Sequence, residues 1–213
     1  MEMKHIYSQG DYDGACFLYA LANAYSAVTG QRPPCGAWDM GIRSLHYAHD
    51  FLGGCIGTSE HFSADPQNIP AAVSVMLSSF NSNGPSLQWA HLPALHELGQ
   101  LAPLVDHKGV IIFRYQGETA HIDAIDHWVC AVATTVKPFR LHLACSYRKT
   151  HEDWKPGGRY REQYHEKMKR YSNNWLDLHH DCQIVAGSIF RIWRDDTGQE
   201  AGKTKRYAID RRI

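Results

Sequence analysis

A single cysteine lies at the point where a glycine-containing segment gives way to an apolar helix. Cys16 follows Gly14 and Ala15 and precedes a run rich in Ala, Leu and Tyr that extends to Val28. The N–H groups of a first helical turn and the helix dipole favour negative charge. A thiol placed there therefore loses its proton more readily than an unperturbed cysteine, whose pKa is about 8.5. Gln9, shortly before it, carries an amide that can donate to a developing oxyanion. The stretch predicts a reactive thiolate.

A thiolate nucleophile needs a base, and His127 is the strongest candidate. It follows Asp126 and opens an apolar run, 128–133, whose composition predicts a buried strand. A histidine at the end of such a strand can face a cleft while its backbone is held rigidly. Because Cys16 and His127 are far apart in the sequence, only the tertiary structure can bring them together.

These motifs resemble those of the papain-like cysteine peptidase superfamily, in particular its minimal bacterial members, which include domains that process peptides during export. The resemblance rests on Gln9, Gly14-Ala15-Cys16 and His127-Trp128-Val129. It implies an α+β fold, in which an N-terminal helical part with the nucleophile helix packs on a C-terminal antiparallel β-sheet that carries the base. By position it implies that Cys16 is the nucleophile, His127 the general base and Gln9 the oxyanion donor.

The residue that should orient the imidazole is the point where this chain departs from the family. An Asn or Asp usually follows on the next strand, but the corresponding segment, 139–146, ends without a carboxylate or amide. Ser146 at its end can accept a hydrogen bond from His127 and is the preferred third residue. Asn174 is the alternative, since it lies in a Ser-Asn-Asn-Trp sequence further along the chain. A Cys–His dyad, weak activity, or a scaffold without catalysis would also fit this departure.

The predicted reaction is acyl transfer from an amide through a thioester on Cys16. With water as the second acceptor the protein is a cysteine peptidase-like hydrolase acting on a peptide or protein substrate, and with an amine it is a transferase. A glutamine deamidase or transglutaminase-like effector shares the first half of this reaction and remains an alternative. So does a papain-like binding module, in which Cys16 is a packing residue of its helix. We expect no cofactor.

Two other segments contain residues that could bind ligands. His179, His180, Asp181 and Cys182 are zinc ligand types, but neighbours on a strand point to opposite faces, so at most two or three could meet one ion. We interpret them as a polar turn and expect no metal. The charged stretch 155–170, with its interleaved aromatic residues, could touch nucleic acid, but it is more simply a solvated helix face.

Length and composition indicate a single enzyme-sized domain over residues 1–213. The 22 basic and 22 acidic residues balance, which argues against a nucleic-acid or membrane module. No segment approaches the ~20 apolar residues that cross a bilayer, and residues 1–5 show no secretory signal. The six cysteines contain no Cys-x-x-Cys pair, so we expect reduced thiols and a cytoplasmic location, with export as an effector the alternative. Nothing indicates the oligomeric state.

Patterning predicts a helical first half and a sheet-rich second half. The predicted helices are 15–28, 37–52, 71–80, 92–101 and a surface helix at 160–171. The predicted strands are 109–115, 125–133, 139–146, 182–193 and 206–209. The polar segment 150–175 contains this surface helix, and a flap over the cleft is the alternative for it.

Overall fold

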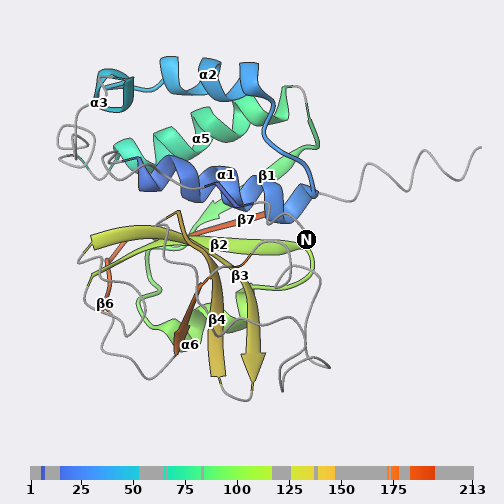
Figure 1. Cartoon of the computed structure of the whole chain (residues 1–213). Helices are drawn as coiled ribbons and strands as arrows, with labels where there is room; N and C mark the ends of the chain where they lie inside the picture. The colour runs from blue at the N-terminus through green and yellow to red at the C-terminus, as the bar shows by residue number, and fades with distance from the viewer. Residues whose placement is uncertain are drawn as a thin grey trace, which may run out of the picture.

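The computed structural model is a mixed α+β protein in which N-terminal helices cover one face of an open antiparallel sheet (Figure 1). It describes residues 6–7, 15–52, 65, 67–82, 84–116, 126–136, 139–146, 172, 174–177 and 183–194. The predicted α+β class with an N-terminal helical part is therefore confirmed. The segments predicted at 160–171 and 206–209 lie outside the described residues.

Helix α1, Cys16–Thr29, is the central element of the helical part. Its run of Ala, Leu and Tyr combines good helix formers with side chains that fill a core, and all residues from Phe17 to Ala27 except Tyr19 are buried. Gly30 ends the helix in the left-handed region, at φ 73°, with its N–H donated to the carbonyl of Ser26. The predicted helix 15–28 is confirmed.

The structure describes three further helices in this layer: α2, Cys35–Arg43; α3, His49–Leu52; and α5, Asn68–Asn81. Helix α5 confirms the prediction at 71–80. The single helix predicted over 37–52 is wrong, because the chain leaves helical geometry after Arg43 and Tyr47 adopts a φ of 61°. Gly41 allows α2 to approach α5, since a Cβ there would lie 2.8 Å from the Met76 sulfur.

The sheet has the strand order β1-β7-β2-β3-β4-β5, with β6 paired to β2, and all pairs are antiparallel. The strands are β1, Leu87–His91; β2, Gly109–Gln116; β3, Asp126–Val136; β4, Phe139–Ala144; β5, Asn174–Asp177; β6, Gln183–Ile184; and β7, Phe190–Arg194. The three central predicted strands, which correspond to β2, β3 and β4, are confirmed. A register shift interrupts the β3–β4 pairing between Ala131 and Ala133.

Several local predictions are corrected. The helix predicted at 92–101 is reduced to α6, Leu98–Leu101, followed by the 3-10 turn η1, Ala102–Leu104, because Glu97 starts the helix through a capping box with Gln100. The strand predicted at 182–193 is two strands, β6 and β7, separated by a turn in which Gly187 has a φ of 74°. Strands β1 and β5 are not predicted by the local pattern.

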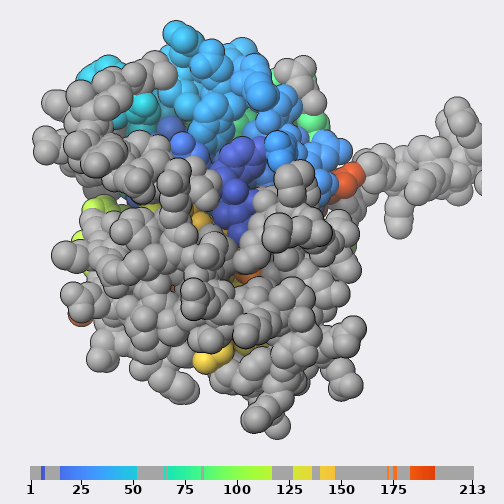
Figure 2. Space-filling model, in the orientation of Figure 1, coloured from blue at the N-terminus to red at the C-terminus, as the bar shows by residue number. Residues whose placement is uncertain are grey.

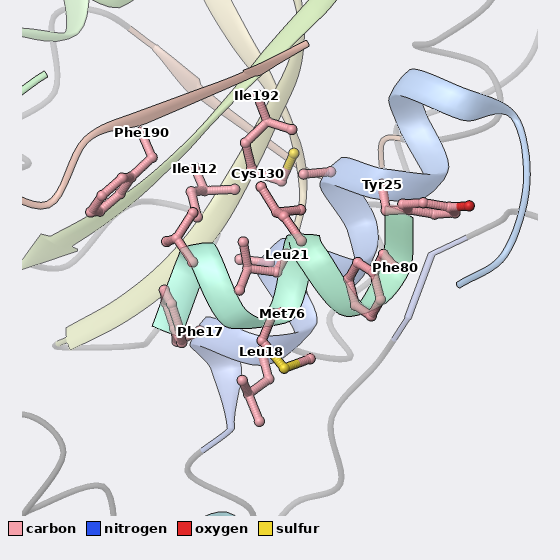
Figure 3. Packing of buried hydrophobic residues seen from close by; sticks show 14 of the residues in the cluster. Phe17, Leu18, Leu21, Tyr25, Met76, Phe80, Ile112, Cys130, Phe190 and Ile192 are labelled. Atoms are coloured by element: carbon pink, nitrogen blue, oxygen red, sulfur yellow. The ribbon is translucent and has the colours of Figure 1, made fainter. Parts of the chain in front are cut away.

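Alternating side chains divide the core into two clusters, one on each face of the sheet. The helix-side cluster joins α1, α2 and α5 to the sheet residues Val110, Ile112, Trp128, Cys130, Val132, Ala144, Phe190 and Ile192 (Figure 3). The outer cluster joins α6 and η1 to Ile111, Phe113, Tyr115, Val129, Ala131, Leu141, Leu143, Cys145, Leu176, Ile184 and Ile189. Helix α1 packs mainly on β3, so the predicted nucleophile helix and the predicted base strand are direct neighbours.

Asp106 closes the turn that leads into β2. One carboxyl oxygen accepts the N–H groups of Lys108 at 2.8 Å and Gly109 at 2.7 Å, and the other lies 3.0 Å from Nη2 of Arg191 on β7. Partial burial of the carboxyl opposes ionisation, but these amides and the guanidinium outweigh it, so the pKa of Asp106 lies below its usual value. The ionised carboxyl therefore stabilises the fold above the unfolded-state pKa of about 4, and this contribution disappears as the pH falls through the folded-state pKa.

Because solvent screens a carboxyl that is 39% exposed, we expect Asp106→Asn to lower the free energy of unfolding by at most about 1 kcal/mol at pH 7, and by progressively less as the pH falls toward 3. Urea unfolding of both proteins at several pH values measures this difference. Asp39→Asn is the control, because Asp39 and its partner Arg43 are both more than half exposed and their ion pair should contribute little. A deficit in Asp106→Asn that stays constant between pH 7 and pH 3 would contradict the prediction.

Candidate active site

Cys16 is the first residue of α1, as the sequence predicts. Its side chain is partly buried and packs against the edge of the helix-side cluster. The residue before it, Ala15, contributes no side-chain cap to the helix. Cys16 therefore lies in the first turn of the helix, where the helix dipole favours a thiolate. In the space-filling view, the darkest blue residues, from the beginning of the described chain, reach the surface in the middle of this face (Figure 2).

His127 is the second residue of β3 and is buried, with 3% of its surface exposed. It is paired across the strands with Tyr115 of β2, whose ring meets the imidazole edge-on at a centroid distance of 6.3 Å. Its Nε2 atom lies 3.4 Å from the sulfur of Cys145, which directly follows β4. Tyr115 and Cys145 both belong to the outer cluster, so the described contacts of the imidazole are on that side of the sheet.

The chain neighbours of the two predicted catalytic residues are in direct contact. Phe17, next to Cys16, meets Trp128, next to His127, with ring centroids 4.9 Å apart and planes at 70°. This T-shaped contact fixes the start of α1 against the start of β3. The structure thus brings together the two backbone segments that the sequence analysis pairs. It also assigns Cys16 to the edge of the helix-side cluster and the described contacts of His127 to the outer cluster, so the Cys16–His127 pairing itself stays a prediction.

The proposed third residues lie near the same end of β4. Ser146 is buried two residues beyond the end of this strand, and its hydrogen bond to His127 stays a prediction. Asn174 is the first residue of β5, and its backbone is paired with Leu143. The residue that the sequence analysis missed is Cys145. The alternation of side chains along β3 and β4 could have identified it. Ala131 is paired with Leu143, and the odd-numbered residues of both strands at this end, Cys145 included, share the outer face.

Gln9 lies outside the described residues, but the chain shortly before it is anchored to α1. The buried amide of Asn23 accepts the N–H of Tyr7 at 2.7 Å and donates to its carbonyl at 3.2 Å. The side chain of Asn23 thus forms hydrogen bonds with both the N–H and the C=O of Tyr7, as a neighbouring strand would. The backbone of Tyr7 is therefore held against α1.

The remaining sequence candidates are only partly described. Cys16, Cys35, Cys130 and Cys145 are thiols and not half-cystines. The donor group 179–182 lies outside the described residues, as does the charged stretch 155–170. In the part of the chain that the structure describes, no three His, Cys, Asp or Glu side chains are grouped in a way that could hold a metal ion. None of the described helices has the length and apolar character to cross a membrane.

A scan of protein-family models and searches of curated proteins and of solved structures find no match to this chain. Its function must therefore be inferred from the side chains at the α1–β3 junction.

Proposed function

We propose that the protein is a thiol-dependent hydrolase or acyl transferase acting on amide bonds, most directly a cysteine peptidase with a papain-like arrangement. Cys16 is the nucleophile and His127 the general base. The observation that carries this proposal is the 4.9 Å contact between Phe17 and Trp128, which holds the helix start that carries the thiol against the strand start that carries the imidazole. The order of the elements, with a nucleophile helix on an antiparallel sheet, supports it further.

The reaction follows from the chemistry of these groups. The imidazole of His127 takes the proton of Cys16, and the sulfur attacks the carbonyl carbon of the substrate amide. The oxyanion is stabilised by the N–H of Cys16 and by the side chain of Gln9, and one such donor can lower the barrier by about 3 kcal/mol. The imidazolium protonates the departing amine, and a thioester on Cys16 remains. Water then releases the acid and restores the thiol, while an acceptor amine would instead form a new amide.

A catalytically inactive papain-like binding module is the second candidate, and the burial of His127 among outer-cluster residues favours it. In that case the imidazole would be a packed structural residue, and the Cys16 thiol would react like an ordinary cysteine. The two candidates therefore differ in the reactivity of one sulfur.

Limited labelling with iodoacetamide at pH 6 to 7 distinguishes them. Under the enzymatic proposal, Cys16 reacts at least tenfold faster than Cys35, an exposed thiol that also begins a helix and serves as the internal reference. His127→Ala should slow the reaction of Cys16 at least tenfold. His142→Ala is the matched control, since His142 is equally buried on the neighbouring strand and should leave this rate unchanged. Peptide mass spectrometry of the labelled protein measures all rates together, and equal labelling of Cys16 and Cys35 would favour the binding module.

A further inference from the structure

The contact between Cys145 and His127 supplies a function for a cysteine that the proposed reaction does not use. The Cys145 sulfur lies 3.4 Å from Nε2 of His127, at a place where both residues are almost fully excluded from solvent. A thiol this deeply buried has no access to a substrate. It is, however, at the hydrogen-bond distance of a sulfur from one of the two imidazole nitrogens.

We propose that Cys145 is the positioning residue that orients the imidazole of His127. This inference rests on the proposed function of Cys16 and His127. The sulfur accepts the Nε2–H hydrogen bond, which fixes the tautomer in which Nδ1 carries the lone pair. Nδ1 then receives the proton of Cys16, and Nε2–H continues to donate to Cys145 in the imidazolium form. Cys145 keeps its own proton throughout.

Strand geometry supports this assignment over Ser146. Cys130 is paired with Ala144 and Ala131 with Leu143, so alternate side chains of β3 and β4 fall into opposite clusters at this end of the sheet. Cys145 belongs to the outer cluster, as does Tyr115, whose ring meets the imidazole of His127 edge-on. The edge-on Tyr115 ring and the Cys145 sulfur thus constrain the imidazole from two directions.

The choice of sulfur has a chemical consequence. A thiol is a weak hydrogen-bond acceptor and is neutral, so it stabilises the imidazolium less than a carboxylate would. Cys145 therefore acts by orienting the imidazole and not by placing a charge beside it. An amide oxygen at position 145 is a stronger acceptor in the same direction. Cys145→Asn should therefore preserve the orientation, whereas Cys145→Ala should lose it.

The kinetic experiment follows the alkylation rate of Cys16 as a function of pH in Cys145→Ala, Cys145→Asn and the control Cys130→Ala. Cys130 is equally buried, but its side chain lies in the helix-side cluster. We expect the rate of Cys145→Ala at pH 6 to fall five- to tenfold, with the inflection moved to higher pH. Cys145→Asn should restore the rate, and Cys130→Ala should match the wild type. Equal losses in Cys145→Ala and Cys130→Ala would overturn the proposal, since only packing would then be at work.

A second measurement does not depend on the reactivity of Cys16. Nitrogen-15 NMR of the histidine rings, with the His127 signals assigned by comparison with His127→Ala, reports which ring nitrogen carries the proton. We expect Nε2–H in the wild type near pH 7.5 and a mixture of tautomers in Cys145→Ala. A predominant Nδ1–H tautomer in the wild type would overturn the orienting function of Cys145. Slow labelling of Cys16 together with the Nε2–H tautomer would count against the proposed enzymatic function and leave the Cys145–His127 contact in place.

Discussion

Cys16→Ala should abolish the rapid release of nitrophenolate when the protein is mixed with p-nitrophenyl acetate. In the wild type, the sulfur attacks the activated ester, nitrophenolate leaves and a thioester remains on Cys16. We therefore expect a burst of about one nitrophenolate per protein, followed by slower hydrolysis of the thioester. Without the sulfur no acyl-enzyme forms, so the burst should vanish and only the uncatalysed rate should remain. Stopped-flow absorbance measures the burst, and intact-protein mass spectrometry detects the acetyl group.

The same variant should keep its fold. Cys16 is partly exposed at the start of α1, and its replacement by alanine removes only a small side chain from the edge of the helix-side cluster. We expect the free energy of unfolding to change by less than about 1 kcal/mol. Cys35→Ala is the control for the loss of an exposed thiol and should retain the burst. A loss above about 3 kcal/mol in Cys16→Ala would instead indicate that Cys16 is a packing residue.

The elements that the sequence predicts correctly are those whose local pattern and tertiary environment agree. Helix α1 is apolar around most of its circumference and is buried, and Gly30 ends it in a conformation that glycine favours. Strand β2 is β-branched and aromatic because it lies between two clusters in the middle of the sheet. In both cases, the residues that favour the element are also the residues that the core requires.

The errors arise where a single residue or a distant partner decides the structure. The positive φ of Tyr47 divides the helix predicted at 37–52, and local patterning gives no sign of it. Strand β1 is held by its pairing with β7, roughly a hundred residues away in sequence, so its own composition did not reveal it. The predicted helix at 92–101 was favoured by Pro93, but the capping box at Glu97 starts the helix later.

The candidate site shows the same division. Local patterns predict Cys16 at the start of a helix and His127 at the start of a strand, and the structure confirms both placements. The neighbour of the imidazole depends on the register between β3 and β4, which includes an irregularity at Ala131 to Ala133. Register is a tertiary property, so the local pattern does not reveal Cys145 as a neighbour of the imidazole, and the hydrogen bond of Ser146 to His127 stays a prediction.

Trp128→Ala should produce the largest loss of stability among the substitutions near the site. Trp128 is 6% exposed and contacts Phe17 of α1 and Phe190 of β7. Its removal leaves a cavity between α1 and the sheet, and we expect the free energy of unfolding to fall by about 3 to 5 kcal/mol. Phe17→Ala should have an effect of similar size. The double variant should lose less than the sum of the two, by about 0.5 to 1.5 kcal/mol, because the two rings contact each other. Urea unfolding of the four proteins measures this coupling.

The control separates general loss of stability from loss of alignment at the site. Phe80 is fully buried in the same cluster, but its ring contacts Tyr25 in the second half of α1 (Figure 3). It also stacks on Trp38 of α2. Phe80→Ala should destabilise the protein by a similar amount. At a temperature where all variants are folded, Phe17→Ala should slow the alkylation of Cys16 several-fold, while Phe80→Ala should leave it unchanged. Equal rates in both would mean that the contact between α1 and β3 stabilises the fold without aligning the thiol and the imidazole.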